Sequence, residues 1–361
     1  MTNVLTQACR SLAAAAALWA AASLSAEPVR AEIKAQEFTV VGTPSSLDHW
    51  KLHESKLFKE MIPKASGGKL TANAKPRDEL GLAGFPVMRQ LRLGAFDFVF
   101  GDFTYVAGDS PIIEGTELSG LAQSVDQYRQ MQEAYKPVFD KIFKEKFGAK
   151  ILLMYAWPSQ QLWCNFGDRN RKDISLKDLA GKKVRTFSAP QGDFVTGLKA
   201  SPVSITFAEV VPALQKGVAD CALTGTLPAY SAKWYQVITH NIRIRLGYIG
   251  SFLAVRNKVW NGLSKEAQDV ITGQIDAIRE DMWTWTKNAD QLGMDCNAQG
   301  PCPIGPVGNM TAIEPSDADK ALVKDIVANR VVRNWVQRCG DQCAGDWNAT
   351  VGKVLGISAS K

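Results

Sequence analysis

Two neighbouring stretches in the middle of the chain decide the fold class. The stretch from Ser175 to Arg185 reads SLKDLAGKKVR, and the stretch from Ser201 to Asp220 reads SPVSITFAEVVPALQKGVAD. The first predicts a short helix that begins at a serine cap and stops at a glycine, followed by a strand. The second predicts a strand, a helix that ends at Gly217, and a further strand. Strands that alternate with single crossover helices indicate an α/β fold whose sheet is largely parallel.

The same alternation extends outward in both directions. We expect strands over 38–41, 70–74, 97–100, 151–155, 162–165, 183–187, 203–206 and 218–223, and helices over 47–65, 85–93, 125–147 (interrupted at Pro137), 175–179, 194–198, 208–216 and 317–338. A longer helix begins at Ser264 and carries apolar residues every three or four positions as far as Gly293. Its length of ~45 Å, at about 1.5 Å per residue, exceeds one small domain. Since 361 residues also exceed what one hydrophobic core usually supports, the helix is expected to lie across two lobes.

The composition is that of a folded globular protein. Hydrophobic residues make up 46% of the chain and charged residues 22%, which excludes a disordered chain, a collagen-like repeat and a coiled coil. The formal net charge of +6 is spread along the chain without a block of five like charges. Nucleic-acid-binding proteins gather such charge into a stripe, so we expect no nucleic-acid partner, and the diffuse balance slightly favours small anionic ligands.

Residues 1–26 are interpreted as a secretory signal peptide. Arg10 supplies a positive start, Leu12–Leu24 forms an alanine-rich apolar run, and Ser25 and Ala26 offer a cleavage site of small residues. A membrane anchor is the alternative, but a run of ~13 residues is shorter than the about 20 that a spanning helix needs. We therefore expect an exported protein from which the signal peptide is removed.

The cysteines indicate disulfides, because an exported chain meets an oxidising compartment. Six of the seven cysteines follow the signal peptide, and these are Cys164, Cys221, Cys296, Cys302, Cys339 and Cys343. The close spacing within each of the last two pairs favours two local bridges, and the first two cysteines, both on expected strands, then pair with each other or remain thiols. A bridge is favoured for them. A zinc site built from the last four cysteines is the alternative, although neither spacing is the usual two-residue knuckle.

Catalytic motifs are weak throughout the chain. His49 and His53 stand four residues apart, on one face of an expected helix, but their order is not a metalloprotease motif, so a solvent-exposed face is favoured over a metal site. Neither a glycine-rich phosphate loop nor a Gly-x-Ser-x-Gly nucleophile elbow follows any expected strand. We expect no catalytic residue, metal or cofactor. An exported metal-dependent enzyme that uses the two histidines remains an alternative.

The quoted stretches closely resemble the extracytoplasmic solute receptors of TRAP (tripartite ATP-independent periplasmic) transporters, of the dicarboxylate-receptor type. In that family a strand written DLKGLKIR ends in an arginine, and a segment written PFSEVYxALQxGVVDG follows. Asp178–Arg185 and Thr206–Asp220 match this pattern at nearly every position, and Leu91–Asp97 is similar to a family segment that ends G-x-x-D. The resemblance extends more loosely over the rest of the chain after the signal peptide.

The resemblance implies a fold and a function. The fold is a two-lobe α/β periplasmic-binding-protein fold (type II-like) with a ligand cleft between the lobes and the long helix spanning both. Residues 32–160 and 249–289 would form lobe I, and residues 161–248 and 290–361 would form lobe II. The implied function is that of a periplasmic receptor that captures an organic acid and delivers it to a membrane permease. A ligand-sensing receptor domain for signalling is a second alternative.

The resemblance also implies site residues. Arg185 is similar to the arginine that pairs with the ligand carboxylate, for which a planar guanidinium with two parallel donors is suited. A surface arginine in a local ion pair is the alternative. Phe207 corresponds to an aromatic residue of the cleft, unless it is a core side chain. Asp102 falls where other members place a polar cleft residue, and Thr43 follows the first strand at the cleft edge.

The departures from the family pattern bear on the ligand. Thr224 stands where the family has a ligand-contacting asparagine, and Gln161 falls about where many members have a second arginine. Trp157 and Trp163 lie nearby, and alternation along a strand would point Gln161 and Trp163 the same way. One cationic contact is thus replaced by a neutral one beside added aromatic surface. We therefore expect a monocarboxylate with an apolar or aromatic body rather than a dicarboxylate or a sialic acid.

Overall fold

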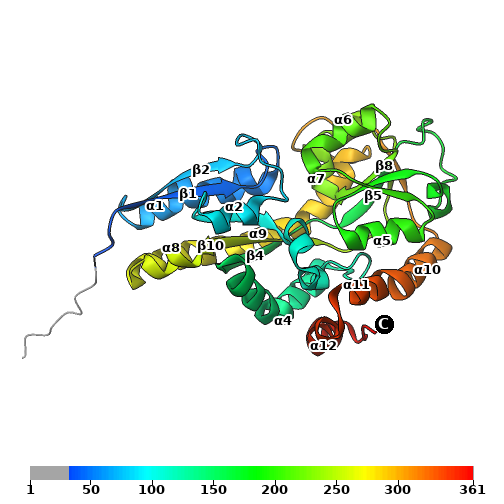
Figure 1. The fold of residues 1–361 in the computed structure, drawn as a ribbon. Coiled ribbons are helices and arrows are strands. Elements are labelled where there is room, and N and C mark those ends of the chain that lie inside the picture. The colour runs from blue at the N-terminus through cyan, green and yellow to red at the C-terminus, as the bar shows by residue number, and fades with distance from the viewer. Residues whose placement is uncertain (1–31, 361) are drawn as a thin grey trace, which may run out of the picture. The chain divides into compact units, whose positions relative to one another are not determined.

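A computed structural model describes residues 32–360, which form two β-sheets surrounded by helices (Figure 1). The expected signal peptide, residues 1–26, lies outside the described residues. Within residues 32–360, no helix is both long and apolar enough to cross a bilayer.

The first sheet combines strands from two distant parts of the chain, in the order β2-β1-β3-β10-β4. Its strands are β1 (Gln36–Gly42), β2 (Leu70–Pro76), β3 (Phe98–Asp102), β4 (Ala149–Trp157) and β10 (Ile249–Arg256). β1 is parallel to β2 and β3, whereas β10 is antiparallel to both of its neighbours, β3 and β4. β3 and β10 read as nearly continuous apolar runs because they are interior strands that are buried on both faces.

The second sheet has the order β11-β9-β5-β8-β6-β7. Its strands are β5 (Gln160–Cys164), β6 (Lys183–Thr186), β7 (Ser201–Ser204), β8 (Cys221–Gly225), β9 (His240–Ile242) and β11 (Thr311–Ile313). β6 is parallel to β7 and β8, and β9 is parallel to β11, whereas β5 is antiparallel to β8 and β9.

The prediction of a largely parallel sheet is confirmed for the strands on which it was based, since β6 is parallel to β7 and β8. Each sheet as a whole is mixed, because β5 and β10 run antiparallel to the strands on either side. The chain passes from β4 to β5 through residues 158–159 and returns from β9 to β10 through residues 243–248. Each link joins strands of different sheets. β5 and β10, the strands that follow the two links, lie antiparallel to the strands beside them.

The helices agree broadly with the expected segments. Beside the first sheet lie η1 (Trp50–Glu54), η2 (Leu57–Met61), α1 (Ile62–Ala65), α2 (Val87–Leu93), α3 (Phe103–Val106), η4 (Pro111–Thr116), α4 (Val125–Ile142), η5 (Phe143–Phe147) and α8 (Asn257–Gly262). With the second sheet lie η6 (Leu176–Leu179), α5 (Ala189–Gly197), η7 (Phe207–Glu209), α6 (Val210–Gln215), α7 (Thr226–Ser231) and η8 (Trp234–Gln236). The C-terminal part forms α10 (Asp317–Ile326), η9 (Val327–Val331), α11 (Val332–Cys339), α12 (Asp341–Ala349) and α13 (Val351–Leu355).

Pro137 does not interrupt its helix, contrary to the prediction. α4 continues through Pro137, and η5 extends it to Phe147. The proline is exposed, so water can satisfy the carbonyl that lacks its N–H partner. On the opposite face Tyr135, Phe139 and Phe143 are completely buried and anchor the helix on both sides of the proline.

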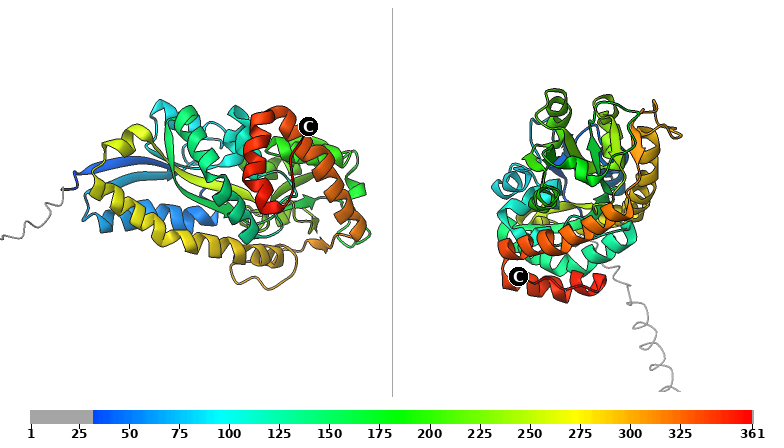
Figure 2. Two further views of the ribbon diagram at one scale, coloured as in Figure 1. Left: turned by 90° about the horizontal axis from the view of Figure 1, so that it is seen from below. Right: turned by 90° about the vertical axis from the view of Figure 1, so that its right-hand side faces the viewer.

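Helix α9 (Lys265–Asn297) is the long helix expected from the sequence. It begins at Ser264, whose hydroxyl accepts a hydrogen bond from the N–H of Ala267. Its N-terminal part packs along the first sheet, and its C-terminal part lies against α7 of the second (Figure 2). The helix therefore connects the two halves of the fold.

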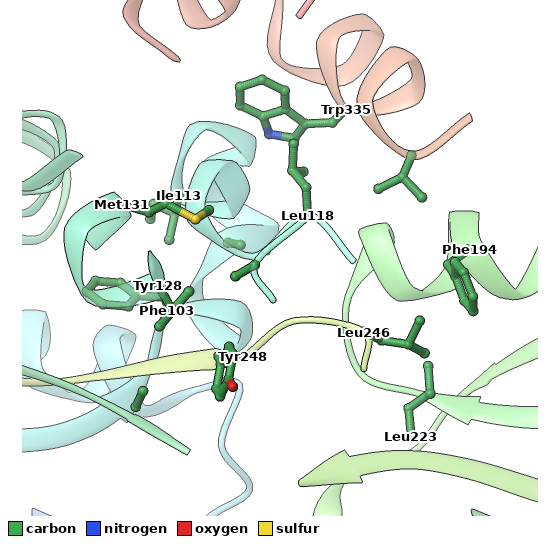
Figure 3. Packing of buried hydrophobic residues seen from close by; sticks show 14 of the residues in the cluster. Phe103, Ile113, Leu118, Tyr128, Met131, Phe194, Leu223, Leu246, Tyr248 and Trp335 are labelled. Atoms are coloured by element: carbon green, nitrogen blue, oxygen red, sulfur yellow. The ribbon is translucent and has the colours of Figure 1, made fainter. Parts of the chain in front are cut away.

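One buried hydrophobic cluster includes residues of both sheets and of the helices beside them (Figure 3). It includes Tyr128 and Met131 of α4, Leu223 of β8 and Trp335 of α11. The indole N–H of Trp335 donates to the carbonyl oxygen of Pro111 at 2.8 Å. The C-terminal helices therefore pack into the cluster that both sheets share and do not form a separate domain.

All three expected disulfides are confirmed. Cys164–Cys221 joins directly opposed positions of β5 and β8, with a Cα–Cα distance of 4.0 Å. Cys296–Cys302 fastens the loop that follows α9, and Cys339–Cys343 links the end of α11 to α12.

Candidate ligand-binding site

A pocket lies between the two sheets, at the ends of their strands. Its lining residues come from both sides of the fold and are Leu47, Arg77, Asp102, Thr104, Tyr105, Trp157, Gln160, Arg185, Phe187, Phe207, Thr224, Gly225, Pro228 and Ile249. The space among them measures about 410 Å³, part of it open to solvent.

The position of the pocket follows from the topology. Asp102, Trp157 and Gly225 are the last residues of β3, β4 and β8, and Gln160 and Ile249 are the first residues of β5 and β10. The first link between the sheets therefore begins and ends at the pocket, and the second ends there. Ligands of open α/β sheets commonly bind at the carboxyl ends of strands, where loops bring side chains together.

Arg185 provides the central positive charge. Its Nε donates to the carbonyl oxygen of Ile205 at 2.9 Å, and its Nη1 donates to that of Leu223 at 2.7 Å. The guanidinium carbon lies 4.3 Å from the centre of the Phe187 ring. Burial lowers the pKa of Arg185 to about 10, although nearby Tyr105 favours the charged form, so the group remains a cation at neutral pH. Nη2 has no hydrogen-bond partner among the described residues.

A second arginine in the lining is already paired. Arg77 Nη2 lies 3.1 Å from Asp102 Oδ2, and Asp102 Oδ1 accepts hydrogen bonds from the indole N–H of Trp157 at 2.8 Å and from the hydroxyl of Ser251 at 2.5 Å. Burial disfavours the charge of Arg77, but Asp102, together with Tyr105 and Glu54, outweighs this effect, and the pKa of Arg77 lies above its usual value. The two opposite charges balance each other, so Arg185 gives the pocket a net charge of about +1.

Apart from Thr104, Gln160 and Thr224, the rest of the wall is mainly apolar. Leu47, Tyr105, Trp157, Phe187 and Ile249 form a buried cluster against which Phe207 packs. Both sides of the fold contribute to this cluster, since Tyr105 follows the first sheet's β3 and Phe187 follows β6 of the second. Their ring centres are 5.9 Å apart. A charged head group with an apolar body would match this combination of surfaces.

Five of the eight expected site residues line the pocket, and they are Asp102, Trp157, Arg185, Phe207 and Thr224. Thr43, Gln161 and Trp163 lie outside the lining. The amide oxygen of Gln161 accepts a hydrogen bond from Asn241 at 2.9 Å, and the indole N–H of Trp163 donates to the carbonyl oxygen of Thr224 at 3.0 Å. The hydroxyl of Thr43 bonds to the buried carboxylate of Glu54. Gln161 and Trp163 lie within β5, whereas the pocket meets this strand at Gln160, its first residue.

The sequence reasoning missed several lining residues, among them Arg77, Tyr105, Gln160 and Phe187. Gln160 adjoins the expected Gln161 and begins β5, and Phe187 lies two residues after the expected Arg185 and directly follows β6. Strand ends were therefore the signal that could have found them. Arg77 directly follows β2, which lies outside the quoted stretches. Only the strand order of the first sheet shows that Arg77 lies at the pocket.

The histidine pair is buried, contrary to the expectation of a solvent-exposed face. The Nδ1 atoms of His49 and His53 lie 3.2 Å apart, and His53 Nε2 lies 3.0 Å from Asp281 Oδ2. The His49 ring packs behind the pocket wall, 4.6 Å from the ring centre of Trp157. Burial lowers the pKa of both histidines. Among residues 32–360, no three His, Cys, Asp or Glu side chains are grouped so that they could hold a metal ion.

Comparisons with known proteins place this geometry in a family. The sequence pattern of the bacterial extracellular solute-binding proteins of family 7, DctP, matches residues 41–298. The sialic acid-binding periplasmic protein SiaP of Vibrio cholerae is 24% identical over 258 residues, which cover 69% of this chain and 76% of SiaP.

Solved structures share the two-lobe fold. A Bordetella pertussis extracytoplasmic solute receptor binding pyroglutamic acid has a TM-score of 0.78 at 18% identity and covers 88% of this chain and 99% of its own. A TRAP periplasmic solute-binding protein of Sulfitobacter with bound β-D-galacturonate has a TM-score of 0.76 at 18% identity and covers 88% and 100%. The expected two-lobe α/β fold and the resemblance to TRAP receptors are thus confirmed, and the chain belongs to family 7 of the bacterial extracellular solute-binding proteins.

Proposed function

We propose that this protein is the extracytoplasmic receptor of a TRAP transporter and that it binds an organic acid with a single carboxylate. The acid would lie between the two lobes and hold them together, because it contacts both. A membrane permease would then accept the acid from the closed receptor. The protein would bind its ligand without chemical turnover.

The observation that carries this proposal is the state of Arg185. The side chain is 1% exposed, faces a pocket with apolar walls, and retains one donor nitrogen without a partner among the described residues. A buried guanidinium is normally paired with a carboxylate or phosphate. Because no carboxylate of the described chain pairs with it, the anion is expected to come from the ligand.

The charge balance of the pocket favours a monoanion. Arg77 and Asp102 form an ion pair, which leaves only Arg185 uncompensated. A second ligand carboxylate near this pair would meet Asp102 as well as Arg77 and would gain little. The expectation of a monocarboxylate thus rests on this ion pair rather than on Gln161. The acids bound by the two solved receptors, pyroglutamate and galacturonate, each carry one carboxylate and support this choice.

We further propose a periplasmic location and a division into two lobes. Residues 1–26 would be a signal peptide that is removed on export. Residues 32–160 and 249–289 would form lobe I, and residues 161–248 and 290–361 would form lobe II, with hinges at the two links between the sheets. N-terminal sequencing of protein recovered from the periplasm would test the cleavage. A start upstream of residue 26 would contradict it.

A ligand screen tests the binding function. Native mass spectrometry of the purified protein would detect an acid that is carried through purification, and a thermal-shift screen would compare aromatic and branched monocarboxylates with succinate and malate. A ligand at 100 times its Kd adds about 2.7 kcal/mol to the free energy of unfolding, which gives a clear shift. We expect monocarboxylates to stabilise the protein most. Stabilisation by C4-dicarboxylates alone would contradict the charge argument.

A further inference from the structure

Four side chains of the pocket carry a buried polar atom that lacks a partner among the described residues. The atoms are Arg77 Nη1, Thr104 Oγ1, Gln160 Oε1 and Arg185 Nη2. Each of the four residues is at most 5% exposed. Buried polar atoms in folded proteins almost always have a hydrogen-bond partner. Four unpaired polar atoms around one pocket therefore indicate which polar groups a bound ligand supplies.

The four atoms require different hydrogen-bond partners. The two arginine nitrogens can only donate, and the Thr104 hydroxyl can donate or accept. These three suit the oxygens of a carboxylate. Gln160 Oε1 can only accept, so a carboxylate oxygen beside it would be repelled. The pocket lining therefore includes one unpaired acceptor and several unpaired donors.

The orientation of the Gln160 amide follows from its neighbour. Its Nε2 donates to the carbonyl oxygen of Pro158 at 3.2 Å. The opposite assignment would place two oxygens against each other, so Oε1 is the atom that is left over. Its backbone is fixed as well, because its N–H donates to Gly247 and its carbonyl accepts from Leu246. The opposing ladder residue, Gly225, has no side chain that could supply a donor.

We infer that Gln160 selects acids that carry an N–H or O–H donor a few bonds from the carboxylate, such as lactam acids or 2-hydroxy acids. This inference rests on the proposed function and narrows it to a ligand class. Arg185, with the aid of Thr104 and Arg77, would bind the carboxylate, and Gln160 Oε1 would receive the donor. A site with a buried acceptor discriminates strongly against an analogue without the donor, because the acceptor is then left desolvated and unpaired.

Matched pairs of acids test the inference on the wild-type protein by calorimetric titration. The pairs are 2-hydroxyisovalerate with isovalerate, and pyroglutamate with cyclopentanecarboxylate. We expect at least one donor-bearing acid to bind about tenfold or more tightly than its partner, since an unpaired buried acceptor costs roughly 1–3 kcal/mol, or about 5- to 150-fold. Equal affinities within every pair that binds would overturn the inference while leaving the proposed function intact. Binding of no carboxylate at all would overturn both.

The variant Gln160→Met assigns the selectivity to this residue, because methionine has a similar volume but only a weak acceptor. It should weaken binding of the donor-bearing acid about tenfold and leave the donor-free acid within about twofold. The matched control is Gln161→Met, one residue further along β5 and outside the pocket lining, which should preserve the ratio between the paired acids. If Gln160→Met keeps the wild-type ratio, the role of Gln160 is refuted. If the variant does not fold, the wild-type ratios alone decide whether the site selects a donor.

Discussion

Arg185 holds its place by two hydrogen bonds to backbone carbonyls of its own side of the fold, from Ile205 and Leu223. These bonds orient the guanidinium so that the remaining nitrogen, Nη2, is the one without a partner in the described chain. A lysine carries its three donors on one nitrogen and lacks the planar fork that directs separate nitrogens toward the two carbonyls and a carboxylate. The residue is thus both a structural brace and the expected anchor of the ligand.

Replacing Arg185 should abolish most of the binding. Arg185→Ala removes the cation from a buried site, at a cost of roughly 2–5 kcal/mol in binding free energy. Arg185→Lys keeps the charge and loses the fork geometry, so it should weaken binding less. Calorimetric titration with the acid identified by the screen measures both, and circular dichroism at the same temperature checks that each variant is folded. Affinity of the alanine variant within threefold of wild type would remove Arg185 as the anchor.

Glu54 should make stability depend on pH in a direction opposite to that of an ordinary paired carboxylate. It is completely buried behind the pocket and accepts hydrogen bonds from Thr43 and Tyr155 at 2.8 Å each. Burial raises the pKa of Glu54 to about 7, above its usual value near 4.5. The folded state therefore retains a proton that the unfolded state has lost, and the free energy of unfolding falls as pH rises from about 4.5 to 7, by at most about 1.4 kcal/mol per pH unit for this group.

Chemical unfolding of wild type and Glu54→Gln between pH 4.5 and 8 measures this effect. The free energy of unfolding of wild type should fall relative to that of Glu54→Gln as pH rises to 7. Above pH 7 the difference between the two proteins should stay constant. Burial also raises the pKa of Glu114 and Glu117, but both are present in the two proteins and cancel in the difference. A difference that does not change with pH would contradict the prediction.

Side chains of the site were only partly predictable from the sequence, for a physical reason. Arg185, Phe207 and Thr224 could be placed at the pocket because each falls at a position that the resemblance to the family assigns to the ligand cleft. Gln161 could not be placed correctly, because a shift of one residue at the start of β5 exchanges it with Gln160. The ion partner of Arg77 depends on strands that are adjacent only in the folded sheet.

At the level of elements, the strand ends present the side chains of the site, and a disulfide links two of those strands. Cys164–Cys221 connects β5 to β8 at the end of the ladder away from the pocket, since Gln160 and Gly225 form the opposite end of the same ladder. The bridge thus fixes the register of the two strands that present Gln160 and Thr224. Register in turn decides which side chains reach the pocket.

The three bridges should differ in their contribution to stability. On the chain-entropy model, the 57-residue separation of Cys164 and Cys221 corresponds to about 4 kcal/mol, and the 6-residue separation of Cys296 and Cys302 to about 2 kcal/mol. Denaturant unfolding of the two double alanine variants measures these values, and the second variant is the control for the first. Thiol counting under denaturing, non-reducing conditions should find no free thiol among the six cysteines. A larger loss for the short loop would contradict the ranking.

Elements were more predictable than their arrangement. α9 could be recognised from its serine cap and its repeated apolar positions, and the capped turn at Ser175 forms as expected. The reversed direction of β5 and β10 could not be recognised, because it depends on how the chain crosses between the sheets. The same limit applies to Pro137, whose exposure on α4 makes it tolerable there and is a property of the packed helix.

At the scale of the whole molecule, one carboxylate of the long helix holds the region where the chain crosses between the sheets. Asp290 Oδ1 accepts hydrogen bonds from the N–H and hydroxyl of Ser159 at 2.6 and 2.7 Å, and from the hydroxyl of Thr226 at 3.1 Å. Its Oδ2 lies 3.4 Å from the hydroxyl of Tyr248. Ser159 belongs to the first link and Tyr248 to the second, so Asp290 fastens both links to α9.

Removing this carboxylate should affect binding without touching the pocket. Asp290→Ala leaves all lining residues in place but frees both links from the helix, so the closed arrangement of the lobes is no longer favoured. If the closed state is less populated, the apparent affinity falls in proportion. We expect about tenfold weaker binding, or roughly 1.4 kcal/mol, together with a smaller ligand-induced compaction in small-angle X-ray scattering than wild type shows.

The control for this experiment lies on the same helix. Asp276 is largely exposed and pairs only locally with Arg279, so Asp276→Ala removes the same charge from α9 without touching either link. It should bind and compact like wild type. Because Asp290→Ala also leaves buried hydroxyls without an acceptor, its thermal midpoint should fall, and binding must be measured well below that temperature. Equal weakening by both variants would mean that the charge of the helix matters rather than the two links, and unchanged binding by Asp290→Ala would show that closure does not depend on this contact.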